Sequence, residues 1–229
     1  MKPAATRREA KDTLYEAFAE AARALSSGRR VELVDVLAQG ERSVDELARE
    51  LDQSVANTSH HLRALARAGF VTSRRAGNRI YYRLASNDVE ELWRALRNVA
   101  ARQVAGIDHL ITAYLGQRDE LEAITRDELH RRMQQGDVVV LDIRPEAEYE
   151  AGHIRGARSV PPKQLRRELE ALPRDIEVVA YCRGAYCVYA DDAIRALQDV
   201  GVTAQRLQDG FPEWRHAKLP VATGPQPDG

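Results

Sequence analysis

The chain has 229 residues, a length that corresponds to about two average domains. Its 44% hydrophobic and 30% charged residues exclude a disordered or collagen-like chain. No apolar run approaches the ~20 residues of a membrane span, and the amino terminus lacks the apolar segment of a signal peptide. We therefore expect a cytoplasmic protein without membrane contact, in which two cysteines five positions apart stay reduced.

The net charge of −1 conceals an uneven distribution. Residues 53–87 contain no acidic residue, and they contain these arginines: Arg63, Arg67, Arg74, Arg75, Arg79 and Arg83. A segment of one sign in a balanced chain indicates contact with a polyanion, with a solvated basic face as the alternative.

The first half of the chain predicts short helices followed by a hairpin. Apolar residues recur with a helical period over 8–26 and 31–38. Ser43 begins a capping-box pattern that predicts a helix over 44–51, and a further helix is predicted over 55–68. Two short helices joined by a tight turn are typical of a helix-turn-helix.

Two β-prone runs, 70–75 and 80–84, flank turn residues and predict a hairpin, or wing, directly after these helices. The second helix offers small polar side chains to base edges in the major groove of double-stranded DNA: Asn57, Thr58, Ser59, His60 and His61. The wing offers three arginines to phosphates or the minor groove: Arg74, Arg75 and Arg79. Alternatively, either His60 or His61 packs inward against Leu62 or Leu65 and does not face DNA.

A long helix is predicted over 88–115. It carries one apolar stripe: Leu92, Leu96, Val99, Ile107, Leu110 and Tyr114. The helix is too long to be covered by so small a domain, which indicates a partner for the stripe.

Residues 28–84, and more loosely 8–115, resemble the ArsR/SmtB family of winged-helix repressors. The resemblance is carried by the segment VDELARELDQSVANTSHHLRALARAGFVTSRRAGNRIYYRLA. It implies a homodimer through the helices 8–26 and 88–115, bound to an inverted-repeat DNA operator.

Many members of this family bind a metal, but this chain lacks the corresponding ligands. The helix 44–51 has no cysteine where many members carry Cys-x-Cys. Asp108 and His109 are adjacent and point to different faces of their helix, whereas a zinc or nickel site needs three or four convergent ligands. We expect no metal and no other cofactor.

The second half predicts an α/β domain. We expect the winged-helix domain over 1–116, a linker over 117–123, the α/β domain over 124–222 and a tail over 223–229. The apolar run Val138–Ile143 is typical of a buried parallel strand, and helices then alternate with strands: helices 146–151, 163–171 and 186–199, strands 159–160, 176–181 and 204–207. The fold class is thus a mainly α winged helix-turn-helix followed by an α/β domain with a parallel sheet.

Both cysteines follow a predicted buried strand. Cys182 leaves that strand, and Cys187 comes just before or within the next helix. A loop that turns backbone N–H groups inward at this place lowers a thiol pKa, and Arg183 adds a positive charge. We therefore expect Cys182 to be a reactive thiolate, with two ordinary buried cysteines as the alternative.

Residues 122–221 resemble the rhodanese family. Three segments carry the resemblance: LDIR with EYEAGHIRGA at 141–157, the loop 182–187, and DGFPEW with LPV at 209–221. The resemblance implies that Cys182 accepts sulfane sulfur as a persulfide from a donor such as thiosulfate or polysulfide. It also implies that Asp142, Arg144 and Gly184 support the loop, and that His153 is structural.

The loop departs from the family pattern at two positions. Its glycine, Gly184, is one place early, and the loop closes with Cys187 in place of Arg or Thr. A second thiol can attack a persulfide on the first and leave a disulfide or polysulfide bridge. The position six after Cys182 is Val188, so a phosphatase or arsenate reductase with an arginine there is not expected.

Three hypotheses follow. The first is a transcriptional repressor whose rhodanese domain senses or transfers sulfane sulfur through a Cys182 persulfide that Cys187 resolves. The second is a sulfurtransferase whose winged helix is chiefly a dimerisation platform. The third is a repressor whose rhodanese domain is catalytically idle and binds a ligand.

Overall fold

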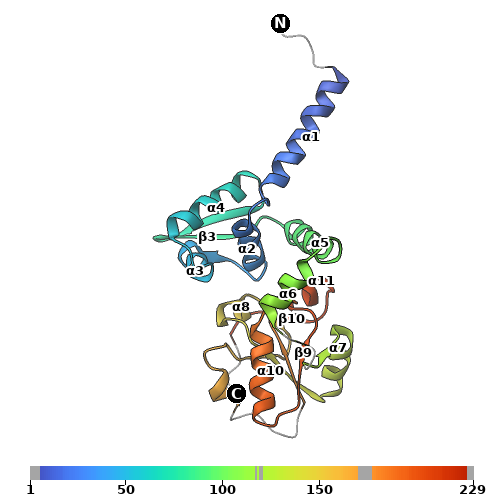
Figure 1. The fold of residues 1–229 in the computed structure, drawn as a ribbon. Helices are drawn as coiled ribbons and strands as arrows, with labels where there is room; N and C mark the ends of the chain where they lie inside the picture. The colour runs from blue at the N-terminus through green and yellow to red at the C-terminus, as the bar shows by residue number, and fades with distance from the viewer. Residues whose placement is uncertain (1–5, 117, 119–120, 170–176, 226–229) are drawn as a thin grey trace. The chain divides into compact units, whose positions relative to one another are not determined.

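The computed structural model describes residues 6–116, 118, 121–169 and 177–225, and it divides the chain into two compact units, Met1–Arg102 and Gln103–Gly229 (Figure 1). The division lies earlier than the linker expected over 117–123. Arg118 within that expected linker already bonds to groups of the second unit. Residues 117, 119 and 120 of the expected linker, residues 170, 171 and 176 of predicted elements, and residues 226–229 of the tail lie outside the described residues.

The first unit is a winged helix. Its elements are α1 (Arg7–Arg23), α2 (Gly28–Leu37), β1 (Arg42–Ser43), α3 (Val44–Glu50), α4 (Val55–Arg67), β2 (Val71–Ala76), β3 (Arg79–Leu84) and most of α5 (Asn87–Gln103). The three strands form an antiparallel sheet in the order β1-β3-β2. The predicted helix-turn-helix and wing are thus confirmed as α3, α4 and the β2–β3 hairpin.

Local signals in the sequence set the starts of the two central helices. The Ser43 hydroxyl accepts a hydrogen bond from the Glu46 backbone N–H at 3.3 Å, and the Glu46 carboxylate accepts one from the Ser43 N–H at 2.8 Å. Ser54 caps α4 by accepting from the N–H of Asn57 at 3.2 Å. Each cap satisfies amide groups that the first helical turn leaves without partners.

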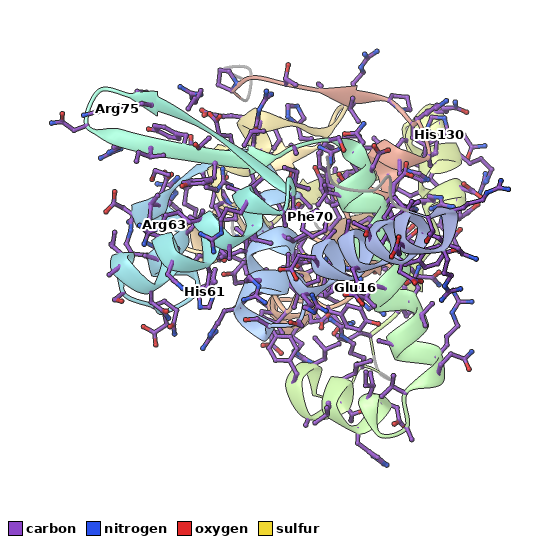
Figure 2. All side chains as sticks on the ribbon, turned by 90° about the horizontal axis from the view of Figure 1, so that it is seen from above. Glu16, His61, Arg63, Phe70, Arg75 and His130 are labelled. Carbon is purple, nitrogen blue, oxygen red and sulfur yellow. The ribbon has the colours of Figure 1, made fainter. Side chains whose placement is uncertain are left out.

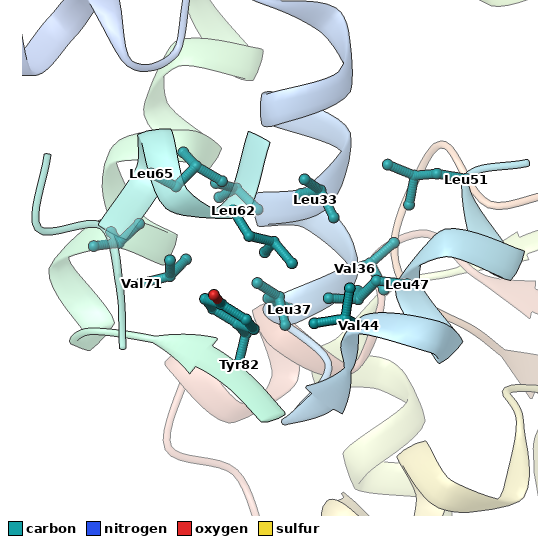
Figure 3. Packing of buried hydrophobic residues seen from close by; sticks show 12 residues of the cluster. Leu33, Val36, Leu37, Val44, Leu47, Leu51, Leu62, Leu65, Val71 and Tyr82 are labelled. Carbon is teal, nitrogen blue, oxygen red and sulfur yellow. The ribbon is translucent and has the colours of Figure 1, made fainter. Parts of the chain in front are cut away.

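The core of this unit lies between the helices and the wing (Figure 3). Leu62 and Leu65 on the inner face of α4 are fully buried, in one cluster with Leu33 of α2 and Leu47 of α3. Tyr82 brings the wing into the same cluster. Because α4 is anchored along this inner face, its opposite face is held outward in a fixed orientation.

The helix predicted over 88–115 is interrupted. α5 ends at Gln103 and α6 spans Ile107–Leu115, with Gly106 between them at φ +84°, a left-handed conformation that ends a regular helix. Most side chains of the apolar stripe are exposed, as expected: the exposed fraction is 69% for Leu110 and 65% for Tyr114. The helix α1 has no buried residue, and it exposes Leu14, Tyr15 and Phe18. Apolar surface of this extent is typical of an interface.

The second unit is an α/β domain. Its elements are α6, β4 (Ala123–Ile124), α7 (Arg126–Gln135), β5 (Val138–Asp142), α8 (Glu146–Ala151), β6 (His153–Ile154), β7 (Arg158–Ser159), α9 (Leu165–Leu169), β8 (Glu177–Tyr181), α10 (Tyr189–Asp199), β9 (Ala204–Leu207), α11 (Phe211–His216) and β10 (Val221–Ala222). Five strands form a parallel sheet in the order β4-β9-β8-β5-β7, as predicted.

Two apolar clusters flank this sheet. One contains Ile194 and Leu197 of α10, and the other contains Phe211 and Trp214 of α11. The register pairs Asp142 at the end of β5 with Tyr181 at the end of β8. The loop that carries both cysteines therefore leaves the sheet at the carboxyl ends of adjacent strands, where α/β proteins commonly place their chemistry.

Candidate functional site

Four of the five α4 residues that were predicted to contact DNA are accessible to solvent. Asn57 and His60 are exposed, and Ser59 and His61 are half-buried. Thr58 is only 1% exposed, so the prediction that it faces DNA is wrong. At its position the helix turns toward the core cluster that also holds Leu62.

His61 lies in a positively charged part of the surface. Its pKa is lowered by burial first, and then by the neighbouring charges of His60, Arg30 and Arg29. The rings of His60 and His61 meet edge to face, with centroids 5.6 Å apart. The positive charges around His61 therefore favour an anion.

The wing holds its arginines in different ways. Arg74 forms a two-pronged ion pair with Glu41, with Nε 2.9 Å from each carboxylate oxygen, and its guanidinium lies over the ring of Tyr81. Arg75 at the tip of the hairpin donates to the Gly77 carbonyl at 3.1 Å and, like Arg63 on α4, points outward (Figure 2). A hydrogen bond to Tyr81 raises the pKa of the exposed Arg79. Arg74 thus braces the wing, while Arg63 and Arg75 extend the basic surface.

The thiol loop, defined as residues 182–188, connects β8 to α10. Cys182 is 3% exposed and Cys187 is half-buried, and both are free thiols. The Cys182 Sγ donates weakly toward the carbonyl oxygens of Cys187 at 3.7 Å and Gly184 at 3.9 Å. The N–H of Cys187 donates to the Gly184 carbonyl at 3.1 Å, so the loop folds back and brings its ends together.

The two thiols differ in acidity. Burial raises the pKa of Cys182 well above its ordinary value, outweighing the N–H groups of Gly184 and Ala190. The pKa of Cys187 is lowered because Cys182 donates a hydrogen bond to it, with the N–H groups of Arg183 and Tyr189 adding to the effect. The expectation of a lowered pKa at Cys182 is therefore wrong, because the loop stabilises negative charge at its far end.

Arg183 also differs from the expectation. Its guanidinium forms a fork with the fully buried carboxylate of Glu148, with Nε 3.1 Å from both oxygens and Nη2 2.6 Å from one. The positive charge of Arg183 is thus largely balanced by Glu148, and it contributes only a minor part of the lowering at Cys187. Glu148 was part of the recognised family segment, but no local pattern connected it to the loop.

Asp142 and Arg144 form a buried ion pair beside the loop. Arg144 Nε lies 2.9 Å from Asp142 Oδ1, and both side chains have no exposed surface. The Tyr181 hydroxyl donates to Asp142 Oδ2 at 2.5 Å and accepts from the Ile154 N–H at 3.1 Å. Because Tyr181 directly precedes Cys182, this network fixes the start of the thiol loop.

Two further residues contact the loop. The N–H of Phe211 donates to the Cys182 carbonyl at 3.1 Å. Arg118, which the sequence placed in a linker, bonds to two loop carbonyls and to Asp191 of α10. The Nδ1–H of His153 donates to the Tyr149 carbonyl at 2.8 Å, and its ring stacks on the Tyr149 ring, so both contacts are to a neighbouring turn of the fold. Within the described part of the chain, no group of three or more His, Cys, Asp or Glu could hold a metal ion.

The two halves match two families. Residues 27–73 match the bacterial regulatory protein arsR family, and residues 125–217 match the rhodanese-like domain. Both predicted resemblances are confirmed. The chain belongs to the ArsR family of bacterial regulatory proteins, in a form that carries a rhodanese-like domain after the winged helix.

One similar protein spans both halves. The HTH-type transcriptional regulator Rv0324 of Mycobacterium tuberculosis is 44% identical over 214 residues, which cover 93% of this chain and 94% of that protein. The uncharacterized protein YqhL of Bacillus subtilis is 30% identical over 111 residues, 48% of this chain and 85% of that protein. The winged helix-turn-helix domain of Mb0332 from Mycobacterium bovis has 36% identity, covers 45% of this chain and 94% of that domain, and superimposes with a TM-score of 0.40. None of the described helices is both long and apolar enough to cross a membrane.

Proposed function

We propose that the protein is a DNA-binding transcriptional repressor whose rhodanese-like domain responds to sulfane sulfur. The observation that carries the proposal is a pair of free thiols in one loop at the end of β8, with the Cys182 Sγ 3.7 Å from the Cys187 carbonyl oxygen, in a chain whose other half is a winged helix. A thiolate stabilised by a neighbouring thiol and by backbone N–H groups is a suitable nucleophile or proton acceptor.

The winged helix supplies the DNA-binding half of the proposal. In this proposal the outer face of α4 enters a major groove and the exposed arginines of the wing meet phosphates. Exposed apolar side chains on α1, α5 and α6 support a homodimer, whose twofold symmetry requires an inverted-repeat operator.

The first chemical step loads sulfur on Cys182. Cys187, the more acidic thiol, is the proton acceptor for the buried Cys182. The Cys182 thiolate attacks a sulfane sulfur of an inorganic polysulfide. A bond forms between Cys182 Sγ and that sulfur, the adjacent S–S bond breaks, and the shortened polysulfide leaves with the electron pair.

The second step closes the loop. Cys187 passes its proton to the outer sulfur of the persulfide, and its thiolate attacks Cys182 Sγ. The persulfide S–S bond breaks and hydrosulfide leaves, so the two thiols are oxidised to a disulfide while one sulfane sulfur is reduced. Cys187 lies five residues from Cys182 in a loop that folds back on itself, which suits an intramolecular disulfide.

Intact-mass spectrometry and DNA binding of the full chain test the proposal together. Polysulfide treatment is expected to convert wild type to an intramolecular disulfide and to change its affinity for operator DNA. At raised pH, Cys187→Ser is expected to accumulate one extra sulfur on Cys182, and Cys182→Ser is expected to form no persulfide. A persulfide on Cys187 in the second variant would reverse the roles. An unchanged DNA affinity across these states would favour a sulfurtransferase.

A further inference from the structure

Arg118 lies outside both recognised family segments, yet it reaches the thiol loop. It follows the last residue of α6 by three positions, and its side chain is 16% exposed. Its Nη1 donates to the Ala185 carbonyl at 2.5 Å, and its Nη2 donates to the Cys187 carbonyl at 3.0 Å. Its Nε donates to the buried Asp191 carboxylate at 2.5 Å. Arg118 therefore connects one carboxylate of α10 to two carbonyl groups of the loop.

This geometry suits a guanidinium and no other side chain. A guanidinium is planar and presents several N–H donors in a fixed fork, whereas a lysine ammonium is a point charge on a flexible stem. The Cys187 carbonyl that Arg118 holds is also the one nearest the Cys182 thiol, at 3.7 Å from Sγ. The position of this carbonyl thus influences how the two thiols face each other.

A second arginine reinforces the site. Arg206 of β9 has its Nε 3.8 Å from the other Asp191 oxygen. Burial lowers the pKa of Arg206, and the charge of Arg118 acts in the same direction. Two arginines beside one carboxylate leave excess positive charge next to the loop, where Arg183 is already balanced by Glu148. This arrangement favours a negatively charged sulfur.

We propose that Arg118 is a positioning residue of the thiol loop, which holds the Ala185 and Cys187 carbonyl groups so that Cys187 stays folded back against the Cys182 thiol. The inference rests on the proposed thiol chemistry, and it names the residue that prepares the loop for it. Arg118 acts through the loop backbone and does not itself meet the sulfur donor.

The test compares Arg118→Gln and Arg118→Lys with Arg132→Gln in the full chain. Arg132 is a matched control because it forks between Glu128 and Glu177 in the same domain. The rate of alkylation of each cysteine by iodoacetamide is measured against pH by peptide mass spectrometry. In Arg118→Gln the midpoint for Cys187 is expected to rise by about one pH unit, which is a tenfold change in the thiol equilibrium. The midpoint for Cys187 in Arg118→Lys is expected to lie between those of Arg118→Gln and wild type. The midpoint in Arg132→Gln is expected to equal that of wild type.

Wild-type midpoints in Arg118→Gln would overturn the inference. If Arg118→Gln does not fold, Arg118→Lys decides the question, since it keeps the positive charge and loses the planar fork that reaches both carbonyl groups. Its midpoint for Cys187 must lie above that of wild type, and an unshifted midpoint would overturn the inference equally. Alkylation needs no sulfur donor, so this test decides the role of Arg118 independently. The proposed function is refuted separately, if the wild-type protein does not react with polysulfide.

Discussion

Gly210 lies directly against Gly184 of the thiol loop. A Cβ atom at Gly210 would lie 2.3 Å from the Gly184 nitrogen and 2.5 Å from its Cα, distances that backbone atoms cannot accommodate without moving. The next residue, Phe211, donates its N–H to the Cys182 carbonyl. The segment before α11 therefore limits the space available to the loop from outside.

Gly210→Ala is expected to displace the thiol loop and to slow polysulfide-driven disulfide formation by about tenfold or more, because loop geometry positions both sulfurs. The measurement is the rate of disulfide formation by intact-mass spectrometry. Gly201→Ala is the matched control. Gly201 has φ +78° with open space around it, so this change costs roughly 1 kcal/mol of stability and leaves the loop intact. Equal rates in the two variants would contradict the steric explanation.

Cys187→Ser is expected to move the alkylation of Cys182 to lower pH. Burial raises the pKa of Cys182 in both proteins, but the hydrogen bond to Cys187 and the negative charge of that thiolate raise it further in wild type alone. The converse variant, Cys182→Ala, removes the hydrogen bond that lowers the pKa of Cys187, so Cys187 should titrate at higher pH than in wild type. A wild-type pH profile for Cys182 in Cys187→Ser would refute the coupling between the two thiols.

Arg75→Ala is expected to weaken binding to all DNA sequences alike and to reduce the slope of log K against log salt by about 0.9, the loss of one phosphate contact. Fluorescence anisotropy at several salt concentrations measures both quantities. Arg131→Ala serves as the control, because Arg131 is exposed on α7 of the rhodanese-like domain. A slope that Arg75→Ala leaves unchanged would place the wing tip away from the DNA backbone.

Thr58→Val is expected to leave DNA affinity unchanged, whereas Asn57→Ala is expected to weaken it by about 1 kcal/mol or more. Thr58 is buried, and its hydroxyl has no hydrogen-bond partner among the described residues, so a valine of similar shape fits its site. The same titrations give the comparison. If Thr58→Val binds DNA more weakly than wild type at an unchanged melting temperature, Thr58 contacts DNA and the prediction is contradicted.

Tyr181→Phe is expected to lower the free energy of unfolding by about 1–3 kcal/mol, because it leaves the Ile154 N–H and one oxygen of the buried Asp142 without the hydroxyl. Urea denaturation measures the loss. Tyr15→Phe, at an exposed position on α1, should change the stability by much less. Similar values for the two variants would show that the hydroxyl contributes nothing to the fold.

Features encoded within a few residues were predictable from the sequence. Ser43 and Glu46 fixed the start of α3, and the apolar run from Val138 predicted β5, because both signals are local. The place of the loop that carries both cysteines, between a buried strand and a helix, was also predictable. The break at Gly106 was missed because the apolar stripe continues across it, although a glycine there was a visible signal.

The electrostatics of the loop could not be predicted. Arg183 is balanced by Glu148, 35 positions earlier, and the loop carbonyls are held by Arg118, more than 60 positions earlier. Neither contact can be predicted from a local sequence pattern, because its partners are far apart in the chain. The order of the two thiol pKa values depends on burial and on which N–H groups face which sulfur, so it required coordinates.

The position of Arg118 determines where the chain can be divided. A fragment that begins at residue 124, where the rhodanese-like domain was expected to start, retains both cysteines but loses the arginine that holds their loop. A fragment that begins at residue 103 keeps it. A chimera that joins the rhodanese-like domain to another DNA-binding domain therefore has to include the connecting segment from residue 103 if the thiol loop is to keep these two hydrogen bonds.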